Sequence, residues 1–148
     1  MALKHTDFMR SISKTIGGHL PGAYQGFRLG ETRWYMQLYF GSERLIHYEV
    51  SRPWSRIGRQ IEIGLHFESR NRSLNQELLF ALDRYLPEIK DQLNSDVKAE
   101  IWDRGWTKVY EIHPDQDLSE SLVKTTASRL AKFITVVQPI YQSIRQDS

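Results

Sequence analysis

The chain contains no cysteine, and this absence excludes three kinds of chemistry at once. A chain without thiols forms no disulfide, binds no metal through thiolates and has no cysteine nucleophile. The absence also fits a reducing compartment. We therefore expect a cytoplasmic protein.

Long apolar runs are missing as well. No stretch of the sequence approaches the roughly 20 apolar residues that a membrane-spanning helix needs. Residues 1–10 carry Lys4, Asp7 and Arg10 and lack the apolar segment of a signal peptide. We expect neither membrane association nor a secretion signal.

The sequence motifs of several common enzyme classes are also absent. There is no P-loop, no dinucleotide-binding fingerprint and no G-x-S-x-G nucleophile turn. The tripeptide Glu88-Ile89-Lys90 has the acid-x-Lys pattern of restriction-type nucleases, but it falls in a predicted helix, where residues two apart diverge. The five histidines lack the close spacing of a helical metal motif. We therefore expect no enzyme activity and no catalytic, cofactor-binding or metal-ligating residues.

The charge balance is mildly basic, with 20 Lys and Arg against 18 Asp and Glu. This is not the strong basic excess that is typical of a dedicated nucleic-acid binder. The length of 148 residues suits one domain with an ordinary core. We expect residues 1–148 to form a single α+β domain.

Apolar and polar residues alternate in several segments, most clearly from Ile61 to Phe67. Such alternation predicts strands of a sheet with one buried face, and apolar residues three or four apart predict helices. The expected strands are 33–40, 44–50, 60–68, 97–102 and 106–112. The expected helices are 6–16 with Thr6 as N-cap, 73–93 with a kink or break at Pro87, and a long last helix capped by Asp117 that bends near Pro139.

These segments follow the order α-β-β-β-α-β-β-α, with residues 19–32 and 51–59 as loops. We predict an α+β two-layer sandwich whose largely antiparallel, five-stranded sheet carries the helices on one face. The opposite face is then open to water or to a partner.

Several segments between residues 59 and 145 share the pattern of one known family. They are the strand 61–67, the helix around Leu82 and Ile89, the hairpin 100–103 and the C-terminal helix at 133–140. This part of the chain resembles an uncharacterised bacterial domain that often follows restriction-endonuclease-like domains. The resemblance implies an association with DNA. The order of elements also resembles the type III secretion chaperone fold, but that family is generally acidic and this chain is basic.

Two histidines and two glutamates are expected on the open face. His47 and Glu49 share one face of their strand, and Glu62 and His66 share the corresponding face of the next. If the two strands pair antiparallel, His47 lies opposite Glu62 or Gly64. A metal or acid–base role is one interpretation of this group. We favour ordinary solvent-facing side chains that do not converge on a shared ion.

The segment 51–59 combines arginines and an aromatic residue without an acid. Arginine with an interleaved aromatic suits contact with phosphates and bases. The alternative is a solvated loop whose Trp54 packs back onto the core. The candidate nucleic-acid-binding residues are Arg52, Trp54, Arg56 and Arg59, with Arg70 and Arg72 after the next strand.

The open face also carries more aromatic surface than a solvated sheet needs. The candidate interface residues are Tyr35, Tyr39, Leu45 and Trp102. Alternatively, the 19–32 loop or a helix covers them. The sequence favours a non-catalytic binding or assembly module that acts through this face as a homodimer, with a protein partner as a further option. The second hypothesis is a nucleic-acid-associated accessory module of a restriction or defence system.

Overall fold

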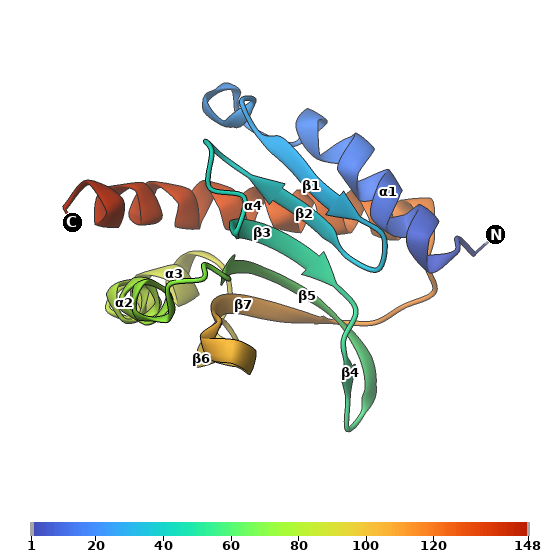
Figure 1. Ribbon diagram of the computed structural model, residues 1–148. Coiled ribbons are helices and arrows are strands. Elements are labelled where there is room, and N and C mark those ends of the chain that lie inside the picture. Colours follow the sequence, from blue (N-terminus) through green and yellow to red (C-terminus); the bar gives the residue numbers. More distant parts are fainter. Residues whose placement is uncertain (1, 148) are drawn as a thin grey trace.

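Two helices, α1 (His5–Thr15) and α4 (Glu120–Gln146), lie against each other across one face of the sheet. The computed structural model describes residues 2–147, and Figure 1 shows both helices behind the strands. Apolar residues at helical spacing bury one side of each helix. The buried side chains of the two helices include Phe8, Met9, Ile12, Leu130, Phe133, Ile134 and Val137.

The sheet is antiparallel throughout and runs in the order β1-β2-β3-β5-β7-β6, with β4 paired to β5 outside this path. The strands are β1 (Arg28–Thr32), β2 (Met36–Tyr39), β3 (Ile46–Ser51), β4 (Trp54–Ser55), β5 (Gly58–Phe67), β6 (Lys98–Ile101) and β7 (Thr107–Pro114). The long central strand β5 therefore connects the β1-β2-β3 half of the sheet to β7 and β6.

The predicted α+β class and antiparallel sheet are confirmed, but the predicted count of five strands is wrong. β1 falls in the 19–32 segment that was expected to be a loop, and β4 falls in the 51–59 loop. Neither strand has an alternating apolar pattern, because β1 contains one large apolar residue, the exposed Leu29, and β4 is two residues long. Backbone pairing with an existing strand stabilises them instead.

The helices begin and end at different residues from those predicted. The 73–93 helix breaks before Pro87 into α2 (Arg72–Asp83) and α3 (Leu86–Gln92). The N-cap of α4 is Ser119, whose side chain accepts a hydrogen bond from the Leu122 N–H; Asp117 is not the cap. Thr6 lies inside α1 and does not cap it. Short 3₁₀ turns occupy Ile16–Gly18, Gly22–Tyr24 and the predicted turn Asp103–Gly105.

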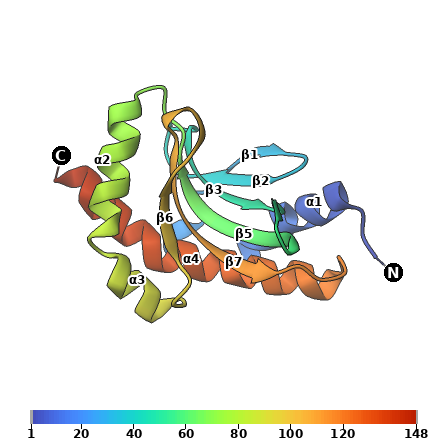
Figure 2. The ribbon, with the colours of Figure 1, turned by 90° about the horizontal axis from the view of Figure 1, so that it is seen from below.

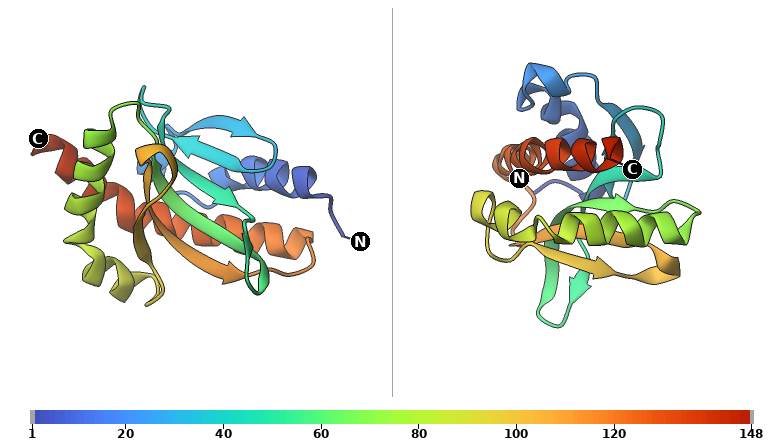
Figure 3. Two further views of the ribbon diagram at one scale, coloured as in Figure 1. Left: turned by 60° about the horizontal axis from the view of Figure 1, so that its bottom comes forward. Right: turned by 90° about the vertical axis from the view of Figure 1, so that its left-hand side faces the viewer.

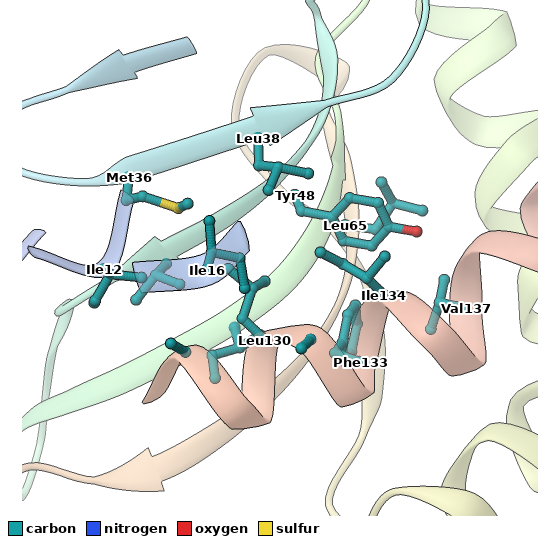
Figure 4. Close-up of a cluster of buried hydrophobic side chains, with 14 of the residues drawn as sticks. Ile12, Ile16, Met36, Leu38, Tyr48, Leu65, Leu130, Phe133, Ile134 and Val137 are labelled. Carbon is teal, nitrogen blue, oxygen red and sulfur yellow. The ribbon is translucent and has the colours of Figure 1, made fainter. Parts of the chain in front are cut away.

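One hydrophobic core lies between the sheet and the two long helices. Figure 4 shows side chains from β2, β3 and β5 meeting those of α1 and α4. Tyr48 extends from β3 into this core, where its hydroxyl donates a hydrogen bond of 2.7 Å to Gln138 Oε1. The inward-facing residues of each strand are therefore fixed to the helix side, and the intervening residues lie on the opposite face.

The opposite face of the sheet is crossed by no helix in the described part of the chain, as Figures 1 and 2 show. The helix α2 stands at one end of the sheet and contacts β7, β6 and α4. At the other end, the β4–β5 hairpin projects beyond the sheet (Figure 3). Among residues 2–147, no helix combines the length and the apolar character needed to cross a membrane.

Candidate metal centre

His47 of β3 lies directly opposite His66 of β5, and Glu49 lies opposite Gly64. The prediction that His47 lies opposite Glu62 or Gly64 is therefore wrong. The predicted face is right, because a register that differs by an even number of residues leaves every side chain on its own side of the sheet. This register places one His-x-Glu tripeptide, His47-Tyr48-Glu49, beside a second, His66-Phe67-Glu68.

The side chains of the two histidines and of Glu49 and Glu62 are buried. The favoured interpretation of the sequence, in which they face solvent, is therefore wrong. The exposed fractions are 2% for His47 and His66, 5% for Glu62 and 9% for Glu49. The Trp102 ring packs edge-on against the His66 ring at 5.8 Å, and Lys108 Nζ lies 4.9 Å from the centre of the Trp102 ring. Neighbouring side chains of the same face thus exclude water from the group.

Four potential ligand atoms, one from each member of the two His-x-Glu pairs, lie within 4.8 Å of one another. His47 Nε2 lies 3.4 Å from a Glu49 oxygen and 3.6 Å from Glu68 Oε2. His66 Nδ1 lies 2.9 Å from Glu68 Oε2 and 3.8 Å from the other Glu49 oxygen. Nitrogen and oxygen ligands about 2.0–2.2 Å from one ion are roughly 3–3.5 Å apart at neighbouring corners. The spacing of this His/Glu cluster therefore suits a shared ion.

The His47 ring is oriented so that one nitrogen faces the cluster as an acceptor. Its Nδ1 lies 3.0 Å from the Arg44 carbonyl oxygen, which can only accept a hydrogen bond. The proton of the neutral ring is therefore on Nδ1, and Nε2 accepts a hydrogen bond of 3.1 Å from the Gln37 side chain. A backbone carbonyl that holds the remote nitrogen of a histidine is a common support for a metal ligand.

The His66 ring has carboxylates at both nitrogens. Nδ1 is 2.9 Å from Glu68, and Nε2 is 3.6 Å from Glu62, an ion-pair distance too long for a hydrogen bond. Burial alone would lower the pKa of His66, but the carboxylates of Glu62, Glu68 and Glu49 outweigh it and raise that pKa to about 9. In the metal-free protein His66 is therefore a buried cation.

The pKa values of Glu49 and Glu62 respond to the basic and polar groups around them. Burial would raise the pKa of Glu49, but His47, His66 and Gln37 lower it below its ordinary value. Burial would likewise raise the pKa of Glu62, but His66 and Lys108 lower it. Lys108 Nζ donates to both Glu62 oxygens, at 3.0 and 3.1 Å, and so fixes the carboxylate that faces His66.

The candidate interface residues surround the cluster without forming one apolar patch. Trp102 packs against His66, and the Tyr35 hydroxyl donates to Glu31. Tyr39 is half-buried, and only Leu45 is an exposed large apolar side chain. The centre of the face is therefore polar and charged.

The candidate nucleic-acid-binding residues separate into two groups. Arg52, Trp54, Arg56 and Arg59 lie in or beside the β4–β5 hairpin, whereas Arg70 and Arg72 follow the far end of β5. The alternative in which Trp54 packs onto the core is wrong, because this side chain is 72% exposed.

The acid-x-Lys tripeptide Glu88-Ile89-Lys90 lies in α3, as predicted, with Ile89 buried. The interpretation of the sequence overlooked a further one, Asp96-Val97-Lys98, at the start of β6. Its Asp96 and Lys98 line a cavity of about 610 Å³. Among residues 2–147, however, the His/Glu cluster is the only group of three or more His, Asp or Glu with converging ligand atoms.

Sequence reasoning placed Glu68 on the correct face but did not include it among the candidate residues. The signal for it was the repeated His-x-Glu tripeptide on two neighbouring strands. With a side-chain period of two, both members of such a tripeptide point to the same face. Comparison with protein-family models, curated proteins and solved structures found no match for this chain.

Proposed function

We propose that this chain is a binding module that holds one divalent transition-metal ion in the His/Glu cluster. The observation that carries the proposal is the convergence of His47 Nε2, His66 Nδ1 and the two carboxylates within 4.8 Å. The ion would lie between β3 and β5, on the face of the sheet that no described helix crosses. Binding there would join the two strands through their side chains.

The charge of the cluster supports a cation as the occupant. Glu62 has Lys108 as a partner, whereas the basic side chains within 4 Å of Glu49 and Glu68 in the described chain are the two histidines. Buried carboxylates are costly unless positive charge and hydrogen bonds compensate for them. A divalent ion supplies two positive charges at the point where these two carboxylates meet.

The donor set favours a transition metal over calcium or magnesium. Imidazole nitrogen suits Zn²⁺, Mn²⁺, Fe²⁺, Co²⁺ and Ni²⁺, whereas Ca²⁺ and Mg²⁺ prefer oxygen ligands throughout. Two imidazoles and two carboxylates can complete a four-coordinate site. Glu62, held by Lys108, faces the remote nitrogen of His66 and would orient that ring as carboxylates do in many zinc sites.

Isothermal titration of the EDTA-treated and dialysed protein with ZnCl₂, and separately with MnCl₂, tests the proposal. We expect one ion per chain, with affinity reduced at least roughly ten-fold in Glu49→Gln. His113→Gln is the matched control, because His113 also lies beside a glutamate, Glu111, at 3.2 Å but outside the cluster. Wild type that binds no better than Glu49→Gln, or a control that loses as much, contradicts the proposal.

Self-association through the same face remains a separate prediction. Three of the four cluster residues, His47, Glu49 and His66, are already buried by their own neighbours, so a second copy is not required to shield them. The homodimer predicted from Tyr39 and Trp102 would therefore form around the cluster's rim. Sedimentation equilibrium of wild type and Tyr39→Asp tests it, with a change from dimer to monomer expected.

A further inference from the structure

The β4–β5 hairpin presents its side chains to solvent at the end of the molecule. Trp54 is 72% exposed and Ile57 at the tip is 85% exposed. The Arg59 guanidinium lies 4.5 Å from the centre of the Trp54 ring and covers one side of it. Because most of the indole is nevertheless exposed, its other side is open to a flat ligand.

The base of the hairpin is tied to a second exposed tryptophan through one histidine. Arg52 Nη1 donates to His5 Nδ1 at 3.0 Å, and His5 Nε2 donates to the Trp34 carbonyl oxygen at 2.6 Å. The His5 and Trp34 rings are 5.2 Å apart, and Trp34 is 65% exposed. Figures 1 and 2 place the β1–β2 turn, the start of α1 and the hairpin at the same end of the molecule.

These contacts form a continuous basic–aromatic ridge that joins three separate parts of the sequence. The contacts link His5, Trp34, Arg52, Trp54 and Arg59, and the ridge also includes two exposed arginines, Arg33 next to Trp34 in the sequence and Arg56 in the β4–β5 hairpin. Arg59 also donates to the Arg52 carbonyl oxygen at 3.0 Å, which links the two ends of the hairpin. The ridge lies apart from the His/Glu cluster, whose residues it does not share.

The ridge remains positively charged even though Asp115 neutralises one of its arginines, Arg52. Asp115 holds Arg52 through two hydrogen bonds, at 2.8 and 3.0 Å, so this arginine anchors the hairpin to the segment before α4. Arg33 and Arg56 are exposed, Arg59 is half-exposed, and the segment 52–59 has no acidic residue. Three arginines therefore remain to contact an anion.

We infer that the basic–aromatic ridge binds single-stranded nucleic acid. Exposed indole faces stack with bases, and nearby arginines contact the phosphates between them. Two exposed tryptophans at one end of the molecule, each with arginines in the same turn or hairpin, provide both kinds of contact. A duplex keeps its bases stacked on one another, so it offers no base face to Trp34 or Trp54.

Fluorescence anisotropy with a labelled oligothymidylate of about 20 nucleotides, longer than the usual site of one small binding domain, measures this binding. The experiment is done in EDTA, so that it does not depend on the metal proposal. With Arg33, Arg56 and Arg59 as contacts, affinity should fall with salt on a log–log slope of about −2, since each single-strand phosphate contact contributes about −0.7. Arg56→Ala should reduce the slope to about −1.4.

Matched variants separate stacking from general attraction. Trp54→Leu should weaken binding about five-fold or more, and Trp54→Phe, which keeps an aromatic face, should weaken it less. Arg70→Ala removes an exposed arginine at the other end of β5 and should leave affinity and slope unchanged. Both tryptophan variants change an exposed position, so we expect them to fold, and circular dichroism checks that they do.

Several results would overturn the inference. One is the absence of binding to the oligothymidylate at low salt. Another is tighter binding to a duplex of the same length, or binding only to vesicles that contain anionic phospholipid. Equal losses in Arg56→Ala and Arg70→Ala would show nonspecific attraction and would also overturn it.

Discussion

His47 and His66 face each other across the β3–β5 pair, with ring centres 5.6 Å apart and ring planes inclined by 29°. Each ring is followed two residues later by a glutamate on the same face of the sheet. The pairing of the two strands therefore brings four ligand side chains together.

The metal-free protein should lose stability between pH 6.5 and 9. The pKa of His66 is raised to about 9 in the folded chain, against about 6.5 in an unfolded one. Its contribution is fully present below pH 6.5 and is lost as the pH rises through 9, by roughly 3 kcal/mol in total. Urea unfolding in EDTA at a series of pH values measures this, and His66→Gln should flatten the slope while His113→Gln should not.

At acid pH the dependence is reversed, and the unfolding free energy falls as the pH falls. The pKa values of Glu49 and Glu62 are lowered by their neighbours, so their stabilisation is present above the ordinary glutamate pKa and is lost as the pH falls below it. The metal-free chain should therefore be most stable between the ordinary glutamate pKa and pH 6.5.

A metal-free chain whose unfolding free energy is constant from pH 6.5 to 9 would contradict the ion pairing of His66.

Lys108 and Glu62 should be coupled strongly in a double-mutant cycle. Lys108→Met removes the cation that holds both oxygens of the buried Glu62, leaves it only His66, at 3.6 Å, among the described basic side chains, and should cost roughly 3 kcal/mol of unfolding free energy. Adding Glu62→Gln removes the charge that Lys108 compensated, so the double variant should recover part of this loss. Additive single effects, within error, would show that the pair does not act as a unit.

Gly64 should not tolerate alanine, because β7 passes close to it. A Cβ at this position would lie 2.7 Å from Tyr110 Cβ and 2.8 Å from the Val109 carbonyl oxygen. Strands β5 and β7 would have to separate, at a cost of roughly 1–3 kcal/mol. Gly18→Ala is the control, since its new methyl group would meet nothing within 4 Å. Equal unfolding midpoints in urea for the two variants would contradict this account.

Zinc should raise the thermal midpoint of the wild type. An ion that binds only the folded chain, at about 100 times its Kd, adds about 2.7 kcal/mol, which corresponds to a shift of roughly 5–10 °C for a chain of this size. Glu68→Gln should remove most of the shift, and His113→Gln should keep it. An equal shift in Glu68→Gln would place the zinc elsewhere on the protein.

The alternation of the strands predicted much of this arrangement. It placed His47, Glu49, Glu62 and His66 on one face, and the structure confirms that face. It did not predict their burial, because Trp102 and Lys108, which pack over the cluster, come from segments 30 to 60 residues further along the chain. The register of the β3–β5 pair could not be predicted either, because a shift by two residues preserves the alternation.

The sequence indicated Arg52, Trp54, Arg56 and Arg59 as one basic–aromatic segment, but it did not indicate that His5, Arg33 and Trp34 extend it. Trp34 falls within the predicted strand 33–40, but β2 begins at Met36 and Trp34 is in the preceding turn. Its contact with His5 joins residues 29 positions apart, and that of His5 with Arg52 joins residues 47 apart. Such contacts depend on the folded arrangement of α1 and the sheet.

Anomalous diffraction at the zinc absorption edge, from crystals of wild type grown with ZnCl₂, tests the metal centre most directly. The account predicts one strong peak between β3 and β5, about 2.0–2.2 Å from His47 Nε2, His66 Nδ1 and a carboxylate oxygen each of Glu49 and Glu68. A strong peak only at another site, such as His113 and Glu111, would contradict it. So would well-ordered side chains at all four positions with no anomalous peak between them.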